Sequence, residues 1–298
     1  MRIVYGLTLL LLLFFKPLAQ AQNGIVVFQS DFGLKDGAVS AMKGVALGVS
    51  PTLKLFDLTH EIPAYNIWEA AYRLYQTVTY YPKGTVFVSV CDPGVGTERH
   101  SVVLLTKSGH YIVTPDNGTL TLIAEQLGIQ EIRQINEAIN RRKNSNESYT
   151  FHGRDVYAYT AARLASHTIT FQQVGPKLPN DVVRLPYQKA EYKDGIVKGT
   201  IPILDSQYGN VWSNIPKAMI EQLGVKPGAT LHVQISQHGK SLYDKPVRWV
   251  NTFGEAAIGD DVAYINSLMD FSVAVNQGNF SEKYKVFSGS DWTIVVRK

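Results

Sequence analysis

Apolar runs of strand length alternate with segments of helical periodicity along the first half of the chain. Residues 25–29, 53–58 and 85–90 are β-rich apolar runs, and the periodicity predicts helices over 36–47 and 66–80 between them. Strands that alternate with helices in this way are typical of an α/β domain. We therefore expect a mainly parallel sheet covered by helices.

Further elements continue this pattern to about residue 164. Residues 102–105 and 111–113 predict a hairpin, because a short polar turn separates two apolar runs. Helices are expected over 119–127 and 155–164. The polar stretch 140–148 between them is expected to be an exposed loop.

The pattern changes after about Pro186. Short alternating runs at 230–235, 262–265 and 292–296 are punctuated by glycines, and only 217–223 has a helical pattern. These runs predict a smaller, mostly antiparallel and barrel-like β domain. We place an N-terminal α/β domain at residues 22–190 and a C-terminal β domain at 191–298.

The first 21 residues have the pattern of a secretory signal. Arg2 precedes a mostly apolar run over 3–15, and Lys16 and an Ala19-Gln20-Ala21 cleavage pattern follow. The run is shorter than the roughly 20 apolar residues that span a bilayer. We expect cleavage after Ala21, a periplasmic or secreted mature chain, and no membrane attachment after cleavage.

Charge and cysteine content narrow the class of protein. The formal net charge is only +4, so the charge does not indicate a protein that binds nucleic acid by electrostatic attraction. Cys91 is the one cysteine in the chain, which excludes an internal disulfide. At the end of a strand, Cys91 is expected to act as small apolar filler.

Polar side chains follow each of the first three predicted strands. Asp31 follows the first strand, His60 lies just beyond the second, and Asp92 follows the third. Open α/β sheets bind ligands beyond the carboxyl ends of their strands. These three endings are therefore candidates for one shared site.

Two segments add charged groups. The first is the loop Asp92-Pro-Gly-Val-Gly-Thr-Glu-Arg99. It either only reverses the direction of the chain or folds Arg99 back toward Asp92, where the guanidinium would keep the carboxylate ionised. His152 precedes a predicted helix, whose positive end disfavours the imidazolium. Arg154 and Asp155 are interpreted as a surface pair and a helix-start charge.

In the β domain, residues 205–215 are rich in groups that recognise small polar ligands. Asp205 can bind an ammonium, Asn210 can pair with a purine edge, and Tyr208 or Trp212 can pack on a ring. A simple turn between two strands explains the same residues equally well.

These segments together resemble the S-adenosylmethionine hydroxide adenosyltransferases, which are relatives of the fluorinases and chlorinases. The resemblance runs from about Ile25 to the C-terminus. It is carried by seven ordered motifs: Ser30-Asp31-Phe32-Gly33, Asp57-Leu-Thr-His60, Asp92-Pro-Gly-Val-Gly-Thr-Glu-Arg99, Pro115-Asp-Asn-Gly118, His152-Gly-Arg-Asp155, Tyr208-Gly-Asn210 and Ala274-Val-Asn-Gln-Gly-Asn279.

The resemblance implies an enzyme that hydrolyses S-adenosylmethionine to adenosine and methionine. It assigns Asp92, Arg99 and His152 to the triad that positions and polarises water. Halide-using relatives have an aromatic in place of Asp92 and a hydroxyl residue in place of Gly153, so the halide pocket is expected to be absent.

The resemblance also assigns residues that hold the substrate. Asp31 corresponds to the carboxylate that binds the ribose hydroxyls, Asp205 to the one that binds the methionine ammonium, and Asn210 to the adenine reader. The remaining substrate-binding residues are Tyr65 over the ribose, Tyr208, Trp212 and Phe253 around the adenine, and Ser267 at the methionine carboxylate.

Two positions depart from the family pattern. Leu268 replaces the arginine of the halide-using relatives, and Met269 replaces a glycine that is usual among the hydrolases, so the contact with the methionine carboxylate is expected to differ. The resemblance further implies a homotrimer with interfacial active sites, no metal and no cofactor.

Two other functions fit the residues taken alone. The first is a metal-dependent hydrolase of a nucleoside or phosphate ester, because strand-end carboxylates and histidines commonly bind metals. Its candidate ligands are Asp31, Asp36, His60, Asp92, His152 and Asp155. The second is a periplasmic nucleoside-binding protein without turnover, in which the triad would have no purpose.

Overall fold

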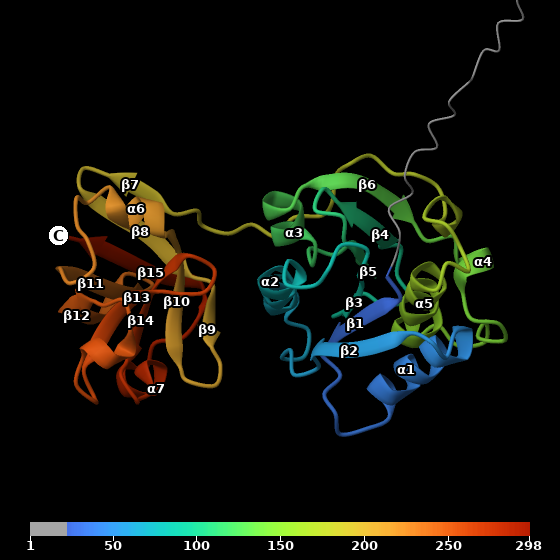
Figure 1. The fold of residues 1–298 in the computed structure, drawn as a ribbon, viewed down its shortest axis with the longest axis horizontal. Helices are drawn as coiled ribbons and strands as arrows, with labels where there is room; N and C mark the ends of the chain where they lie inside the picture. The colour runs from blue at the N-terminus through green and yellow to red at the C-terminus, as the bar shows by residue number, and fades with distance from the viewer. Residues whose placement is uncertain (1–22) are drawn as a thin grey trace, which may run out of the picture. The chain divides into compact units, whose positions relative to one another are not determined.

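The computed structural model of the protein describes residues 23–298, so the predicted signal peptide over 1–21 lies outside the described residues. These residues divide into two compact units between Val183 and Arg184, and each unit is described by itself (Figure 1). Among residues 23–298, no helix combines the length and the apolar character needed to cross a bilayer.

The first unit is built on a six-stranded sheet with the order β2-β1-β3-β5-β4-β6. Its strands are β1 (Ile25–Ser30), β2 (Lys54–Thr59), β3 (Val86–Val90), β4 (Ser101–Thr106), β5 (Tyr111–Pro115) and β6 (Ile129–Gln134). Only β4 runs against its neighbours β5 and β6. The mainly parallel sheet and the hairpin of β4 and β5 are thus confirmed.

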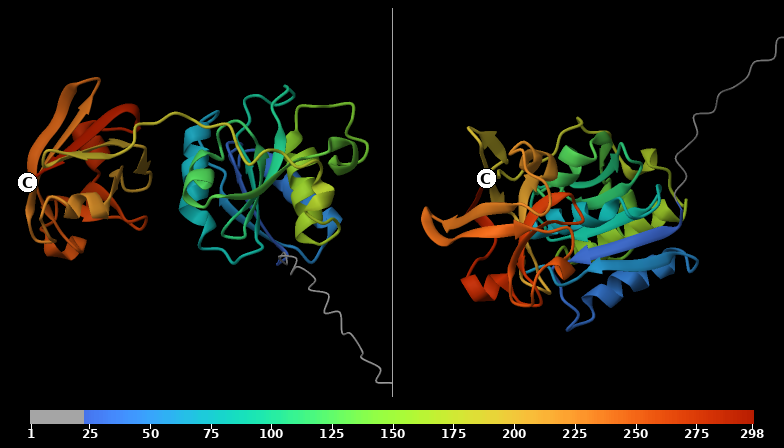
Figure 2. Two further views of the ribbon diagram at one scale, coloured as in Figure 1. Left: turned by 90° about the horizontal axis from the view of Figure 1, so that it is seen from above. Right: turned by 60° about the vertical axis from the view of Figure 1, so that its left-hand side comes forward.

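Helices cover both faces of this sheet. They are α1 (Ala38–Val49), α2 (Ile67–Val78), α3 (Thr121–Gln126), α4 (Glu137–Asn140), α5 (Tyr159–Ala165), the π-helical η1 (Gly153–Ala158) and the 3₁₀ turn η2 (Gln172–Val174). The cores place α1 and α5 on one face and α2 and α3 on the other. In the left view of Figure 2, the cyan helix lies on one side of the sheet and the blue and yellow-green helices lie on the other.

Strand β1 shows why the inner strands of the sheet are apolar on both faces. Val26 and Phe28 pack with α1 and α5, whereas Val27 packs with α2, and all three side chains are buried. Complete burial of such a side chain stabilises the fold by about 1.5–3 kcal/mol. A strand covered on both faces therefore appears as an unbroken apolar run.

Helix α2 begins where the sequence predicts. The Asn66 side chain accepts a hydrogen bond from the Glu69 backbone N–H at 3.0 Å and so caps the helix. Glu69 lies in the first turn, where its negative charge favours the helix dipole.

Three predictions in this unit need correction. Strand β6 was not predicted, because its two isoleucines, Ile129 and Ile132, lack the alternation of a strand. The helix expected from Asp155 begins earlier, as the π-helical segment η1. The expected exposed loop over 140–148 has buried residues, because Asn140, Arg141 and Ser145 pack inward.

The second unit is a nine-stranded, mostly antiparallel sheet in which only β12 and β13 run parallel. In spatial order its strands are β7 (Glu191–Lys193), β8 (Ile196–Ile201), β15 (Gly289–Arg297), β11 (Thr230–Gln237), β12 (Lys240–Trp249), β13 (Asp261–Ile265), β14 (Asp270–Val275), β10 (Asn210–Pro216) and β9 (Ile203–Asp205). The predicted smaller β domain is confirmed.

This sheet curls, so that β8 meets β10. The Thr200 backbone N–H donates to Asn214 Oδ1 at 2.8 Å, and a Cβ at Gly199 would lie 2.6 Å from Ile215 Cγ1. Only glycine allows this close approach. The short helices are α6 (Lys217–Glu221), η3 (Phe253–Glu255) and α7 (Phe280–Tyr284), and α7 was not predicted.

Candidate active site

The turn that follows β1 places Asp31 at the carboxyl edge of the sheet. Gly33 has a positive φ of 66°, and its backbone N–H donates to the His60 carbonyl at 2.8 Å. Asp31 Oδ2 accepts hydrogen bonds from the Tyr65 backbone N–H at 2.9 Å and from Cys91 Sγ at 3.6 Å. One carboxylate oxygen is thereby held between the ends of β1, β2 and β3.

A cavity of about 230 Å³ opens at this edge. Both Asp31 and Asp92 line it, together with Tyr65 and His152. The structure thus brings together four of the residues assigned from the resemblance. The lining contains two carboxylates and no lysine or arginine.

The loop after β3 folds Arg99 back onto Asp92. Arg99 Nε donates to Asp92 Oδ1 at 2.9 Å, and Arg99 Nη2 contacts Asp92 Oδ2. The side chains are only 11 % and 5 % exposed, so this is a largely buried, bidentate pair. Arg99 lies behind Asp92 and does not line the cavity.

Two further groups hold this pair. Arg99 Nη1 donates to Ser101 Oγ at 3.0 Å, and the Tyr157 hydroxyl donates to Asp92 Oδ2 at 3.3 Å. Tyr157 is fully buried, and burial raises its pKa, so the hydroxyl stays protonated and remains a donor. Sequence reasoning missed Tyr157, although it lies only five residues after His152.

His152 lies between two guanidinium groups. Its Nδ1 is 3.1 Å from Arg99 Nη2, and its Nε2 is 3.0 Å from Arg141 Nη2. Burial lowers the pKa of His152, and the two arginines lower it further, while Glu137 and Asp92 oppose that change. The surroundings of His152 therefore favour the uncharged ring, as its place before a helix also predicted.

Arg141 was missed because it falls in the stretch predicted to be an exposed loop. It is only 8 % exposed, and its Nη2 donates to Glu137 Oε2 at 2.6 Å. Its guanidinium carbon lies 4.7 Å from the centre of the Tyr149 ring. The i, i+4 spacing of Glu137 and Arg141 is the sequence signal that could have found this pair.

Gly153 lets the backbone after His152 pack tightly. A Cβ at Gly153 would lie 3.2 Å from Phe32 Cε2 and 3.3 Å from Met42 Sδ. A hydroxyl side chain, as in the halide-using relatives, has no room at this position unless its neighbours move.

Two other predicted polar residues serve the fold. Asp155 is buried instead of lying in a surface pair, and Arg154 holds it with hydrogen bonds of 2.8 and 2.7 Å. His60 bonds to Ser30 Oγ at 2.6 Å and to Asp57 Oδ1 at 3.0 Å. Within residues 23–298, no group of three or more histidine, cysteine or acidic side chains is arranged to hold a metal ion.

In the second unit, Asp205 and Asn210 lie opposite each other on β9 and β10. Asn210 Nδ2 is 3.4 Å from Asp205 Oδ2. The turn between them carries Gly209, whose φ is 66° and whose missing Cβ leaves room for the Asn279 side chain. Tyr208, in the same turn, is 63 % exposed.

An aromatic chain continues from this pair. Trp212 Nε1 donates to the Tyr264 hydroxyl at 3.1 Å, and the Tyr264 and Phe253 rings are 5.1 Å apart. Trp212 is buried, whereas Phe253 is half-buried. Tyr264 links two predicted residues, and the assignment from the resemblance did not include it.

Ser267 lies in the exposed turn between β13 and β14. Met269, in the same turn, has a φ of 66°, and its backbone N–H donates to the Asn266 carbonyl at 3.0 Å. A left-handed backbone favours glycine, which is the residue that the resemblance implies at this position.

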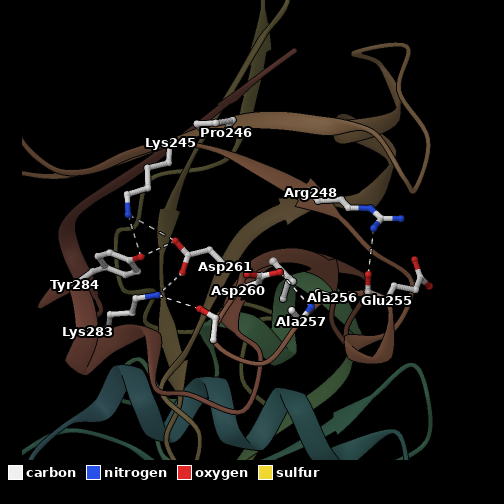
Figure 3. Close-up of a pocket in the computed structure, with 12 residues that line it drawn as sticks. Lys245, Pro246, Arg248, Glu255, Ala256, Ala257, Asp260, Asp261, Lys283 and Tyr284 are labelled. Atoms are coloured by element: carbon white, nitrogen blue, oxygen red, sulfur yellow. Dashed lines mark hydrogen bonds and ion pairs between the residues drawn. The ribbon is translucent and has the colours of Figure 1, made fainter.

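A larger, open cavity of about 530 Å³ lies elsewhere in the second unit (Figure 3). Its lysines are held by Asp261, to which Lys283 donates at 2.9 Å, and Tyr284 donates to the same carboxylate at 2.6 Å. Burial alone would raise the pKa of Asp261, but these hydrogen bonds lower it overall. None of the predicted substrate-binding residues lines this cavity.

Comparison with known proteins follows the same division of the chain. Residues 26–175 match the model of the SAM hydroxide adenosyltransferase N-terminal domain, and residues 199–293 match that of the C-terminal domain. A solved structure of an uncharacterized conserved protein from Thermotoga maritima has a TM-score of 0.85 at 32 % identity, covering 92 % of this chain and all of that chain.

Three relatives illustrate the range of similarity. A protein of Salinispora tropica named (R)-S-adenosyl-L-methionine hydrolase is 34 % identical over 89 % of this chain and 95 % of its own length. Its namesake from Methanocaldococcus jannaschii is 46 % identical, but over 47 % of this chain and 52 % of that protein. A fluorinase of an Actinoplanes species is 29 % identical over 91 % of this chain and 97 % of its own length. The chain therefore belongs to the SAM hydroxide adenosyltransferase family.

Proposed function

We propose that the protein hydrolyses S-adenosylmethionine to adenosine and methionine, by in-line attack of water on the ribose 5′ carbon. The observation that carries this proposal is the convergence of Asp31, Asp92 and His152 on one cavity, with Arg99 bound to both Asp92 and His152. The relatives named for this hydrolysis support it.

The chemistry needs little beyond orientation. The new bond joins the water oxygen to the 5′ carbon while the carbon–sulfur bond breaks, and its electron pair stays on sulfur. Methionine leaves as a neutral thioether, so no general acid is required. Holding the water in line with the sulfur can supply about 7 kcal/mol or more of the rate enhancement.

Asp92 is the group that accepts the proton of the water in this proposal. Arg99 fixes the carboxylate in place, and Tyr157 donates to it from the buried side. Both nitrogens of His152 already face guanidinium groups, so the geometry favours Asp92 over His152 as the direct partner of the water.

The substrate-binding assignments are part of the same proposal. Asp31 and Tyr65 would hold the ribose, and Asp205, Tyr208, Asn210, Trp212, Phe253 and Ser267 would bind the adenine and methionine ends. We also propose a homotrimer that needs no metal or cofactor, and export of the mature chain to the periplasm or medium. Sedimentation mass and the N-terminal sequence of the exported chain test these two points, and a monomer or a retained leader would contradict them.

The decisive experiment incubates purified protein with S-adenosylmethionine in ¹⁸O-water, with and without chelator and chloride, and separates the nucleosides. We expect adenosine that carries ¹⁸O, formed equally under all conditions. Loss of activity with chelator would favour the metal-dependent hydrolase. A chlorinated nucleoside would indicate halide chemistry, and the absence of any product would indicate binding alone.

A further inference from the structure

Arg141 touches His152 from the side away from the substrate cavity. Its Nη2 lies 3.0 Å from His152 Nε2, yet Arg141 does not line the cavity. Glu137 holds this guanidinium through Nε at 3.2 Å and Nη2 at 2.6 Å. Any effect of Arg141 on the reaction must therefore pass through His152.

The contacts of Arg141 with Glu137 and His152 leave one end of its guanidinium unused. Its Nη1 is buried and has no hydrogen-bond partner among residues 23–298. Leaving a buried donor unsatisfied costs free energy. The bond to Glu137 and the ring contact with Tyr149 hold the guanidinium, and its contact with His152 links it to the wall of the cavity.

The two arginine contacts restrict the protonation state of His152. A guanidinium can only donate, a neutral imidazole has one lone pair, and an imidazolium has none. With Arg99 at 3.1 Å from Nδ1 and Arg141 at 3.0 Å from Nε2, the neutral ring can accept from one of them. A protonated ring could accept from neither and would add a third positive charge.

The other groups around His152 do not reverse this balance. Asp92 and Glu137 are negative and raise the pKa of His152, but each is paired with one of the two arginines that contact the ring, and the pKa is lowered overall. Tyr149 and Tyr157 contact the ring edge to face, with centroids 6.4 Å away. The nearest charges that His152 meets are therefore positive on both sides.

We propose that Arg141 is a positioning residue that keeps His152 uncharged at the wall of the substrate cavity. The inference rests on the proposed function, since S-adenosylmethionine carries a positive sulfonium. An imidazolium beside Asp92 would repel that charge and weaken the negative character that Asp31 and Asp92 give the cavity.

The first test is a histidine NMR titration of the full protein without substrate, in which H152N identifies the His152 signal. We expect His152 in the wild type to titrate below its usual value near 6.5. In R141Q its pKa should rise by about 1 unit or more, because one like charge has gone, and R141K should restore most of the wild-type value.

The neighbouring arginine supplies a matched control. Arg142 is 46 % exposed and is 3.9 Å from Asp155, so R142Q should leave the His152 titration unchanged. A wild-type His152 that titrates at 6.5 or above overturns the proposal, even if R141Q does not fold. An unmoved titration in folded R141Q also overturns it.

The second test follows turnover across pH. In R141Q the acid limb of kcat/KM should move to higher pH by the same amount as the NMR titration, with the loss appearing mainly as a higher KM. A uniform loss of kcat at every pH would mark a merely structural role and contradict the proposal. The NMR titration needs no turnover, so it can fail or succeed independently of the hydrolase activity.

Discussion

The two units hold their candidate groups in different ways. In the first unit, Asp92 and Arg99 form a largely buried, bidentate pair at the edge of a sheet that is covered on both faces. In the second unit, Tyr208 and Ser267 are exposed on turns, and the Asp205 carboxylate makes a long contact of 3.4 Å with Asn210.

This difference indicates a division of work. A reacting water must be held to within a fraction of an ångström, which rigid and mutually bonded groups can do. Recognition of the ends of a substrate tolerates groups on turns that settle when the ligand binds. We therefore expect the Asp92–Arg99 pair of the first unit to control kcat, and the groups on the turns of the second unit to control KM.

The largest expected effect comes from Asp92→Asn. The amide keeps the shape of the side chain but loses the charge and the basicity, so kcat should fall by about 100-fold or more, whereas substrate affinity should fall much less, because Asp31 still gives the cavity a negative charge. Glu98→Gln, an exposed change in the same loop, is the control. Stopped-time product assays measure kcat, and calorimetry measures substrate affinity. Normal turnover by Asp92→Asn would show that Asp92 does not accept the proton of the water.

Gly153→Ala tests how rigid the first unit is. The new methyl group meets Phe32 and Met42 at 3.2–3.3 Å, so the free energy of unfolding should fall by about 1–3 kcal/mol. Gly44→Ala is the matched control, since no atom lies within 4 Å of its Cβ position and helix propensity favours alanine. Denaturant unfolding should show a lower free energy of unfolding for Gly153→Ala and a higher one for Gly44→Ala. A change in the same direction in both variants would argue against tight packing around the segment that follows His152.

Asp205→Asn tests the second unit. Loss of a charge-assisted hydrogen bond to the methionine ammonium should raise KM by about 10-fold and leave kcat nearly unchanged. Steady-state kinetics separate the two parameters. A fall in kcat as large as that of Asp92→Asn would break the division of work between the units.

The smallest effect is expected for Met269→Gly. The left-handed backbone at this position favours glycine, but glycine also loses more chain entropy on folding, so the gain in unfolding free energy should be about 1 kcal/mol or less. Thermal unfolding measures it. A clear loss of stability would show that the Met269 side chain makes contacts that outweigh the backbone strain.

Much of the first unit could be predicted from sequence because its patterns are local. The apolar run of β1 and the start of α2 at Asn66 each depend on neighbouring residues, and they lie where expected. Strand β6 could not be predicted in this way, because Ile129 and Ile132 become strand residues only when β4 offers them an edge.

The residues of the candidate site also differ in whether the sequence could reveal them. The motifs identified Asp31, Asp92, Arg99 and His152 as candidates, and the structure brings them together around one cavity. Arg141 and Tyr157 could not be found from the motifs, because their importance comes from contacts across the fold.

The sequence by itself determined the layered first unit, the β-rich second unit and the charged groups at the strand ends, because hydrophobic periodicity and strand order follow from neighbouring residues. Only the tertiary structure decided that Arg141 is buried against His152 and that Asp155 is internal. The burial of a charged side chain depends on partners that fold against it from distant parts of the chain. A local polar pattern is therefore the same whether the side chain is buried or exposed.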